Sequence, residues 1–496
     1  MSRTRYLALN ALSMLIANIF SKIVLFIGMI FLLQYLDAGE ESIYYLVTAF
    51  AMVIAVNFQD GMVVMTIRRI ATDIQNGPRE MGTLYLATSV LALVLAAITF
   101  IASFVYAGIQ FEGENQRIEF IQSAMALTGA FLVGYGYAVA GAGFKAYEKL
   151  WIESILLALQ SIFSAGVYWY GATHQWPLPY FFYGLFITTA FHSTISFIVL
   201  YLFIVKPKFH SDFRSAYELF AESLQLGFAS LLRVLQERIH PFLINIPSLA
   251  GQSYITQWSS PNNLFAHFKF IPLSIRPAMF PTLARKAELE TDEFQVYSLA
   301  LMKFLYLLAL PLLITMSIAR HEVLPLITTM EADFSETYAF AIMVAPLVAW
   351  SIALSFPSQV LRTLFVALKK PQYEFRTVLA GLCVLVVLDI LLLPEYKVMG
   401  AGIASISAEL TILIYGLWLL NKLGRGIKLS HVFLLPTLCG MITHLSAEFL
   451  YRELWIYGIL GVIVVFPILL LIFRVISPVE WSILREMFMP SKPAFK

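Results

Sequence analysis

Charged residues are scarce in this chain. They make up 13% of its 496 residues, whereas soluble domains average about 25%. Hydrophobic residues reach 59% and the mean hydropathy is +0.78. This balance predicts an all-α polytopic membrane protein. The net charge of +2 says little by itself, because in a membrane protein the placement of charges matters more than their sum. We expect membrane lipids and no nucleic acid among its partners.

Cysteine and the common catalytic motifs are also lacking. The two cysteines, Cys383 and Cys439, both lie in apolar stretches, so a disulfide framework or a cysteine metal site is not expected. The sequence has no Gly-x-x-x-x-Gly-Lys-Ser/Thr loop and no His-Glu-x-x-His motif. We therefore expect no cofactor and no metal, and energy drawn from an ion gradient or from the substrate's own gradient. Short external loops argue against an enzyme.

Long apolar stretches dominate what is present. A membrane-spanning helix needs about 20 apolar residues, and the sequence predicts about 14 such spans. The first follows Met1 to Arg5 and runs to about Leu36 without a small-residue cleavage site, so we interpret it as a retained helix rather than a signal peptide. The predicted spans are 10–36, 43–65, 82–108, 119–143, 151–171, 179–205, 224–247, 257–281, 297–319, 335–366, 375–393, 399–420, 431–450 and 454–476.

Loop charges predict the orientation. With the N-terminus in the cytoplasm, nearly all loop lysines and arginines fall on the cytoplasmic side. The exceptions are Arg117, Arg320, Lys397 and Arg452. This asymmetry follows the positive-inside rule. It predicts a multi-pass protein of the cytoplasmic (inner) membrane with both termini in the cytoplasm.

A faint internal repeat predicts the domain organisation. The connection at 35–44 resembles the one at 247–255, and the connection at 144–149 resembles the one at 368–374. Each pair is six predicted helices apart, which is typical of a transporter built from two parallel repeats. We expect a six-helix lobe at 1–215, a second at 216–425, a terminal helix pair at 426–477 and a cytoplasmic tail at 478–496.

The most unusual stretch is 224–281, where two spans carry charges. Arg233, Gln236, Glu237 and His240 follow the spacing i, i+3, i+4, i+7 and share one helical face. Lys269 and Arg276, seven residues apart, share a face of the next span. A cation near the centre of a span costs roughly 2.5–3.5 kcal/mol, so the pattern predicts a polar cavity. The prolines expected to kink or unwind these two spans are Pro241, Pro247, Pro272, Pro277 and Pro281.

Other interpretations of these charges stay open. Arg233 and Glu237 would also neutralise each other across one turn, although Lys269 and Arg276 have no acid within a turn. Lys22 of the first span aligns within about a residue of Arg233 on the repeat, which would place cations on both sides of a central cleft.

Four acids are assigned to the membrane interior: Asp60, Glu237, Asp389 and Glu409. Asp60 and Glu237 are candidates for ion coupling because they lie on the second and seventh spans. Asp60 has an equal alternative as an interfacial cap, or as the partner of Lys22, near the cytoplasmic end of its span. We expect Asp389 and Glu409 to form hydrogen bonds within the second lobe.

Three features look structural. Lys303 and Arg362 lie near cytoplasmic ends, where their stems would reach lipid headgroups. A run of glycines in the fourth span predicts a close-packing face; it comprises Gly129, Gly134, Gly136, Gly141 and Gly143. The segment 479–488 predicts a short amphipathic helix at the membrane surface.

The chain resembles the multidrug/oligosaccharidyl-lipid/polysaccharide flippase superfamily, in particular its O-antigen and polysaccharide flippase branch. The resemblance spans nearly the whole chain and rests on Asn18-Ile-Phe-Ser-Lys22, Asp60-Gly-Met-Val-Val-Met-Thr-Ile-Arg-Arg-Ile-Ala71 and Pro394-Glu-Tyr-Lys-Val-Met-Gly-Ala-Gly-Ile-Ala-Ser405. The density of charge and proline at 233–247 departs from the family pattern.

The resemblance implies two six-helix lobes around a basic central cavity. Alternating access through that cavity would move an undecaprenyl-diphosphate-linked oligosaccharide from the cytoplasmic to the outer leaflet, with polysaccharide assembly proteins as further partners. The cations that would bind the substrate are Lys22, Arg233, Arg238, Lys269 and Arg276.

The sign of the intramembrane charge favours an anionic cargo, because buried cations need compensation. The assigned cations include the five above, Lys303 and Arg362, and they outnumber the four acids. An ion-coupled multidrug exporter of the same superfamily is the main alternative, and a membrane-embedded polysaccharide polymerase or ligase is a weaker one.

Overall fold

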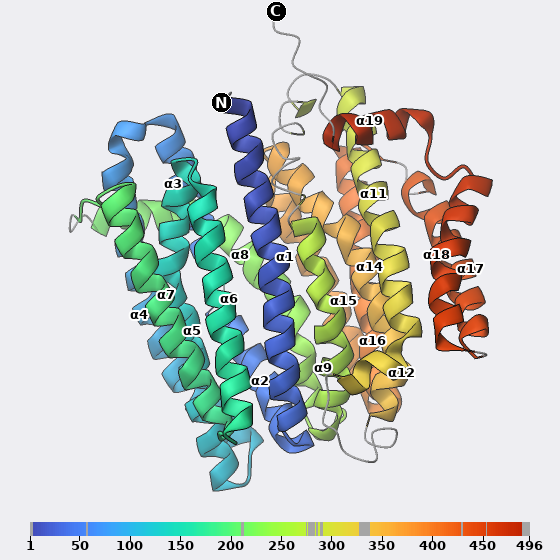
Figure 1. Cartoon of the computed structure of the whole chain (residues 1–496), viewed down its shortest axis with the longest axis horizontal. Coiled ribbons are helices and arrows are strands. Elements are labelled where there is room, and N and C mark those ends of the chain that lie inside the picture. Colours follow the sequence, from blue (N-terminus) through green and yellow to red (C-terminus); the bar gives the residue numbers. More distant parts are fainter. Residues whose placement is uncertain are drawn as a thin grey trace, which may run out of the picture. The chain divides into compact units, whose positions relative to one another are not determined.

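The computed structural model describes residues 3–55, 58–209, 213–273, 275, 283, 286–287, 291–326, 338–427, 430–452 and 454–488. Every regular element among them is helical (Figure 1). Eleven of these helices are long and apolar enough to span a membrane, and a bent pair makes a twelfth candidate. The expected all-α polytopic fold is confirmed, and the chain is a multi-pass membrane protein.

The described residues separate into two compact units, one within 3–256 and the other within 257–326 and 338–488. The first unit contains α1 (Arg3–Tyr35), α2 (Ala38–Ile54), α3 (Phe58–Thr72), the 3-10 turn η1 (Ile74–Asn76), α4 (Gly77–Gln110), α5 (Glu114–Ala146), α6 (Leu150–Thr173), α7 (Leu178–Phe203) and α8 (Phe213–Ile244). α8 packs against α2, α3 and α4 of this unit, although the predicted boundary at residue 215 assigned it to the second lobe.

Helix α9 (Ser253–Ala266) begins in the first unit and continues into the second. The elements that follow are η2 (His267–Lys269), α11 (Thr291–Ile318), α12 (Arg320–Val323), η3 (Leu324–Leu326), α14 (Ala339–Ala367), α15 (Pro371–Tyr396), α16 (Val398–Lys422), the π-helical turn η4 (Ser430–Leu434), α17 (Leu435–Tyr451), α18 (Trp455–Ile472) and α19 (Pro478–Phe488). In its described part, each of the fourteen predicted spans overlaps a helical segment. The span at 43–65 corresponds to the bent pair, and α8 and α9 are not among the eleven apolar helices. Most of 274–281 lies outside the described residues.

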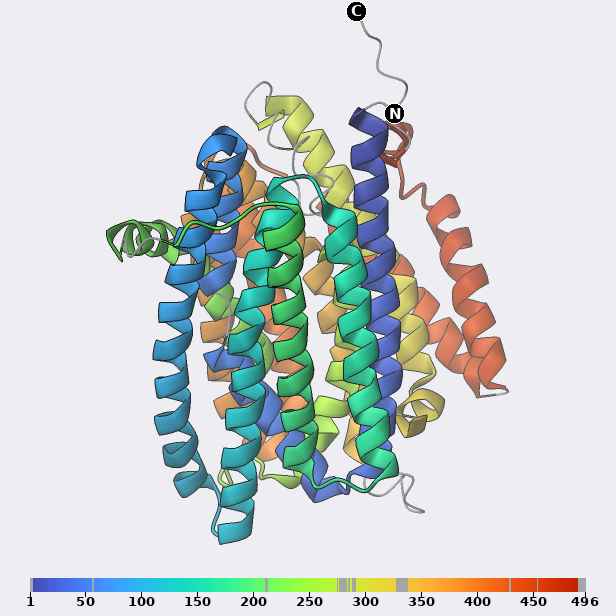
Figure 2. The same ribbon diagram turned by 60° about the vertical axis from the view of Figure 1, so that its left-hand side comes forward.

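Glycines bring α5 and α7 close together in the first unit, as expected. Figure 2 shows these two helices side by side, with α6 next to α1. A Cβ atom on Gly143 would lie 2.5 Å from Leu200, and one on Gly136 would lie 3.4 Å from Ser193. Larger residues would separate the two helices, so the predicted packing face is confirmed.

The span that was predicted at 43–65 is broken. α2 and α3 meet at a bend of 43°, and α3 continues to Thr72. The hydroxyl of Tyr135 donates a 2.6 Å hydrogen bond to the carbonyl of Ala55. This bond satisfies one of the carbonyl groups that the end of α2 leaves without a helical partner.

The prolines of the charged stretch act differently from the prediction. α8 runs through Pro241 and ends at Ile244, so the helix is not unwound at Pro241. A kink at this residue stays a prediction. Proline removes the bond to the carbonyl four residues earlier, and so close to the helix end only one turn is affected. The next span does change geometry, because η2 follows α9 directly. Pro277 and Pro281 lie outside the described residues.

Two cations expected at lipid headgroups are instead paired in the second unit. Lys303 of α11 is 9% exposed, and its ammonium donates to both carboxylate oxygens of Glu480, at 3.0 and 3.1 Å. Arg362 of α14 lies 3.0 Å from Glu374 of α15. The headgroup interpretation of these two residues is therefore wrong. Figure 1 shows α19, which carries Glu480, lying across α11.

Candidate functional site

Lys22 is exposed on a face of α1 that is otherwise turned toward protein. At about 100° per residue, its side chain points the same way as Met29 and Leu33, which are buried. Ile16 and Ile23 point more than a quarter-turn away and form the exposed apolar face of the helix. Lys22 is therefore exposed on a different side of α1 from the apolar face, which is the face suited to contact with lipid.

A second cation lies close to Lys22. Arg238 of α8 is near enough for the two positive charges to repel each other, and Glu237 is the acid whose charge acts on Arg238. Within the described part of the chain, no carboxylate forms an ion pair with Lys22. Two neighbouring cations repel each other, and an anion bound beside both would relieve that repulsion.

Tyrosine hydroxyls adjoin this cation pair. Tyr44 of α2 shares a side-chain hydrogen bond with Tyr168 of α6 and lies within the field of Arg238. Its ring stacks on Phe182 with the centroids 5.9 Å apart and the planes at 11°. These contacts fix the Tyr44 ring, so that α1, α2, α6 and α8 all contribute to one polar site in the first unit. We call Lys22, Tyr44, Tyr168 and Arg238 the cation site.

The charged face predicted on α8 exists as a helical face. Gln236 and His240 are buried, whereas Arg233 and Glu237 are half-buried. Arg238 lies about 140° around the helix from Arg233, so α8 presents its two arginines in different directions. Sequence reasoning placed Arg233 and Arg238 together only because both are positively charged.

The other two predicted substrate-binding cations are not placed at the cation site. Lys269 belongs to the second unit, where it ends η2 and is half-buried. Arg276 lies outside the described residues. Their part in a common site stays a prediction.

Asp60 lies near the break between α2 and α3. It is exposed in the first turn of α3, about 18 Å along the helix from Thr72. Its charge acts on Tyr135. Because Lys22 has no ion-paired carboxylate within the described ranges, the interpretation of Asp60 as the partner of Lys22 is wrong.

Sequence reasoning missed several buried acids. Glu41 is fully buried in α2, because that helix begins at Ala38 and not near residue 43. Glu409 behaves as expected and accepts a 2.7 Å hydrogen bond from Ser358, while Asp389 is fully buried in α15. Glu153 of α6 and Glu374 of α15 are also buried. The sequence did offer one signal for such buried acids: Glu41, Glu153 and Glu374 each lie in the first helical turn after a loop.

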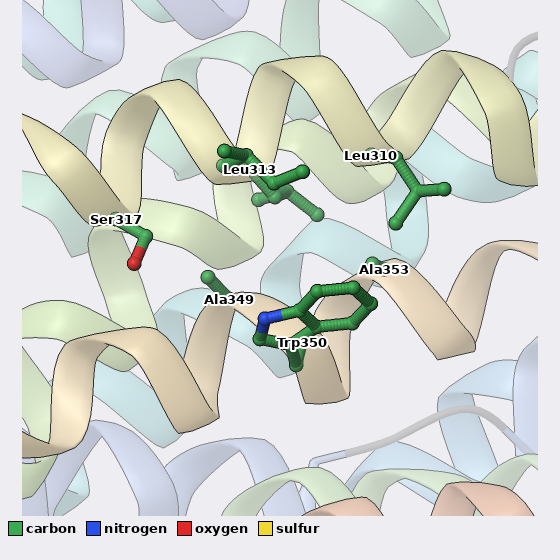
Figure 3. Close-up of a pocket in the computed structure, with 7 residues that line it drawn as sticks. Leu310, Leu313, Ser317, Ala349, Trp350 and Ala353 are labelled. Atoms are coloured by element: carbon green, nitrogen blue, oxygen red, sulfur yellow. The ribbon is translucent and has the colours of Figure 1, made fainter. Parts of the chain in front are cut away.

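A small void of about 10 Å³ in the second unit offers a contrast to the cation site. Figure 3 shows that α11 and α14 line it with Leu310, Leu313, Ala349 and Ala353, together with Ser317 and Trp350. The Trp350 indole donates to Nδ1 of His444 at 3.1 Å, so its polar atom is satisfied. This apolar lining has no group that would attract an anion.

Comparison with known proteins finds solved structures with a similar fold but no protein with a similar sequence. Neither the protein-family descriptions nor the curated sequences contain a match. Among solved structures, the chain is similar to lipid II flippase MurJ in an inward closed conformation, with a TM-score of 0.66, 13% identity and coverage of 92% of this chain and 98% of that one. It is also similar to a MOP superfamily transporter from Pyrococcus furiosus, with a TM-score of 0.64, 14% identity and coverage of 82% and 96%.

A third similar structure is a multidrug resistance MATE family transporter of the MOP superfamily in an inward-facing conformation. The TM-score is 0.61 at 14% identity, with coverage of 84% of this chain and 99% of that one. Identities this low show a shared fold and leave the cargo open. The chain therefore has the fold of MOP superfamily transporters over most of its length.

Proposed function

We propose that this protein flips an undecaprenyl-diphosphate-linked oligosaccharide across the cytoplasmic membrane for surface polysaccharide assembly. The proposal places it in the polysaccharide and O-antigen branch of the MOP superfamily, with both termini in the cytoplasm. Transport proceeds by alternating access through a cationic cavity, without covalent chemistry. Membrane lipids and polysaccharide assembly proteins are its further partners.

The observation that carries the proposal is the pairing of Lys22 with Arg238. Two like charges held near each other raise the energy of the empty site. A diphosphate, with several anionic oxygens on adjacent phosphorus atoms, contacts an ammonium and a guanidinium together. A monovalent cation or a cationic drug would be repelled by the same arrangement.

The overall surplus of cations no longer supports this proposal by itself. Lys303 and Arg362 are neutralised by Glu480 and Glu374. Two further acids are buried: Glu41, which precedes the span predicted at 43–65, and Glu153, which lies inside the span predicted at 151–171. The local charge at the cation site is therefore the argument for an anionic cargo. In the proposal Arg233, Lys269 and Arg276 also contact the diphosphate during transport.

Glu237 and Asp60 are the proposed coupling acids. Glu237 precedes Arg238 in sequence and its charge acts on that guanidinium. Protonating Glu237 would free Arg238 to bind phosphate, so that proton and cargo binding favour each other. Asp60 lies near a helix break, where transporters commonly place ion sites.

The proposal is tested by reconstituting the protein into vesicles with a fluorescent lipid-linked oligosaccharide diphosphate. Flipping is followed by the loss of label accessible to a membrane-impermeant quencher. Lys22→Ala and Arg238→Ala are expected to slow flipping at least tenfold, whereas Lys206→Ala, near the surface end of α7, is expected to leave it unchanged. Unchanged flipping in both cation variants, at equal protein levels, would exclude the cation site.

A multidrug exporter is the second candidate, because the fold is shared with a multidrug resistance transporter. Its cargo would be an organic cation, and its key groups would be Asp60 and Glu237 rather than Lys22. Drug susceptibility of cells that express the protein separates the two functions. Resistance that survives Lys22→Ala and disappears in Asp60→Asn would favour export of drugs.

A further inference from the structure

Glu153 is a buried carboxylate that the cation site does not use. It lies in the first turn of α6, about 5 Å along the helix axis from Leu150. Its side chain is 3% exposed and pairs with Lys145 of α5 at 2.8 Å. The Lys145 side chain is 39% exposed. The cation of this pair therefore reaches the surface, while the carboxylate lies inside.

Only one oxygen of this carboxylate is satisfied. Oε1 faces Lys145, and a Cβ atom on Gly141 would lie 3.0 Å from it. Oε2 has no hydrogen-bond partner within the described residues. A buried carboxylate normally accepts several hydrogen bonds, because an unsatisfied charged oxygen is costly. The pair is therefore weaker than its short distance suggests.

The Lys303–Glu480 pair is a buried ion pair of the same protein in which both carboxylate oxygens accept hydrogen bonds. Both of its side chains are nearly buried, at 11% and 8% exposure. Glu480 accepts from Lys303 through both oxygens and from the backbone N–H of Ser477 at 2.7 Å. Neither partner of that pair can leave without stranding the other in the interior. Lys145, by contrast, can swing into solvent on its flexible stem.

Other titratable groups face Glu153 from the neighbouring helices. Tyr137 of α5 lies within its field, and the ring of His192 of α7 contacts Tyr137 with the centroids 4.4 Å apart. His192 is buried, and its Nε2 has no hydrogen-bond partner in the described part of the chain. From α1, the contacts with the adjacent Ser154 are Ser13 and Met14, neither of which titrates.

We propose that Glu153 is a proton-binding site that holds either Lys145 or a proton. In the first state the ammonium neutralises the carboxylate, as in this structure. When Lys145 withdraws to solvent, a proton from water forms the O–H bond of the carboxylic acid. No covalent bond breaks in the protein, and the charge of the interior is unchanged because one cation replaces another.

His192 extends the site inward. It lies 11 residues before Phe203 at the end of α7, or about 16 Å deeper along the helix. Its ring contacts Tyr137, which lies within the field of Glu153, so the surroundings of Glu153 reach inward to α7. If Glu153 binds a proton during transport, the coupling ion is the proton. This part of the inference rests on the proposed transport function. The site is separate from Asp60 and Glu237.

Infrared spectroscopy of the protein in lipid nanodiscs tests the proposal without any cargo. A carboxylic acid has a C=O stretch that a carboxylate lacks, and a buried acid retains it above about pH 5, where exposed acids are ionised. In the difference spectrum against the unmodified protein, we expect Glu153→Gln to remove one component of this band, and Glu480→Gln, the matched control, to leave that component in place. A band that is unchanged in a folded Glu153→Gln variant, or absent throughout, would overturn the proposal.

Lys145→Met provides the second variant, in case Glu153→Gln does not fold. Removing the competing cation is expected to keep the acid band to a higher pH, whereas Lys145→Arg keeps the original titration. A band that titrates identically in all three proteins would also overturn the proposal. Because cargo flipping is measured separately, loss of the polysaccharide function with an intact Glu153 band would refute only the choice of cargo.

Discussion

Lys22 of α1 and Arg238 of α8 place two positive charges next to each other in the first unit. The two residues are far apart in sequence and lie on different helices. Lys22 is exposed on a face that is buried further along α1. A membrane protein that retains such a pair gains from it when an anion binds.

Diphosphate binding should depend on the charge of Lys22. Inorganic diphosphate is expected to raise the melting temperature of the purified protein, because a ligand that binds only the folded state stabilises it. Lys22→Arg should keep most of this shift, whereas Lys22→Met should lose it. Differential scanning fluorimetry in detergent measures the effect. An equal shift in all three proteins would place the diphosphate elsewhere.

Removing the hydroxyl of Tyr135 should destabilise the broken span. Tyr135→Phe leaves the carbonyl of Ala55 without its donor, among the apolar side chains of Leu95 and Leu132. The expected loss is about 2 kcal/mol of unfolding free energy. Tyr201→Phe, at an exposed position, serves as the control. Equal unfolding curves for the two variants would show that the bond contributes nothing.

Breaking the Lys303–Glu480 pair should release α19. Lys303→Met leaves a buried carboxylate without its cation, at an expected cost of about 3 kcal/mol. Protease cleavage near residue 477 and thermal unfolding should both become easier. Arg214→Ala removes an exposed i,i+4 pair with Glu218 and should change stability by less than about 0.5 kcal/mol. Unaltered proteolysis in Lys303→Met would contradict this role.

The short helix α12 should respond to acid. Partial burial, followed by the charge of Arg320, lowers the pKa of His321 from its ordinary value of 6.5. The folded state therefore binds this proton less readily than the unfolded state. The stability that neutral His321 contributes to the folded state is fully present above pH 6.5. It is lost as the pH falls from there through the lowered pKa of the folded state. Melting temperatures near neutral pH and at about pH 5 should differ less in His321→Gln than in the unmodified protein.

Helix positions and types could be predicted from sequence because each apolar run has only one way to satisfy its backbone in lipid. The glycines of α5 likewise indicated their packing face before α7 was known to fill it. Pro241 does not end α8, because the effect of a proline depends on its distance from the helix end, and the loop residues determine where that end lies.

Partners of single charges were harder to predict. Lys303 and Glu480 are separated by 177 residues, and no local pattern connects them. Arg362 and Glu374 were within reach of sequence reasoning, since they face each other across the short turn between α14 and α15. The closeness of Lys22 and Arg238 depends on how α1 and α8 pack within the first unit, which hydropathy does not encode.

The central claim is that the cargo is an anionic lipid diphosphate. The most direct measurement compares two cargoes in the same proteoliposomes, a lipid-linked oligosaccharide diphosphate and a fluorescent organic cation. We predict flipping of the diphosphate lipid and no movement of the cation, with the flipping lost in Lys22→Ala. Transport of the cation without flipping of the diphosphate lipid would contradict the account.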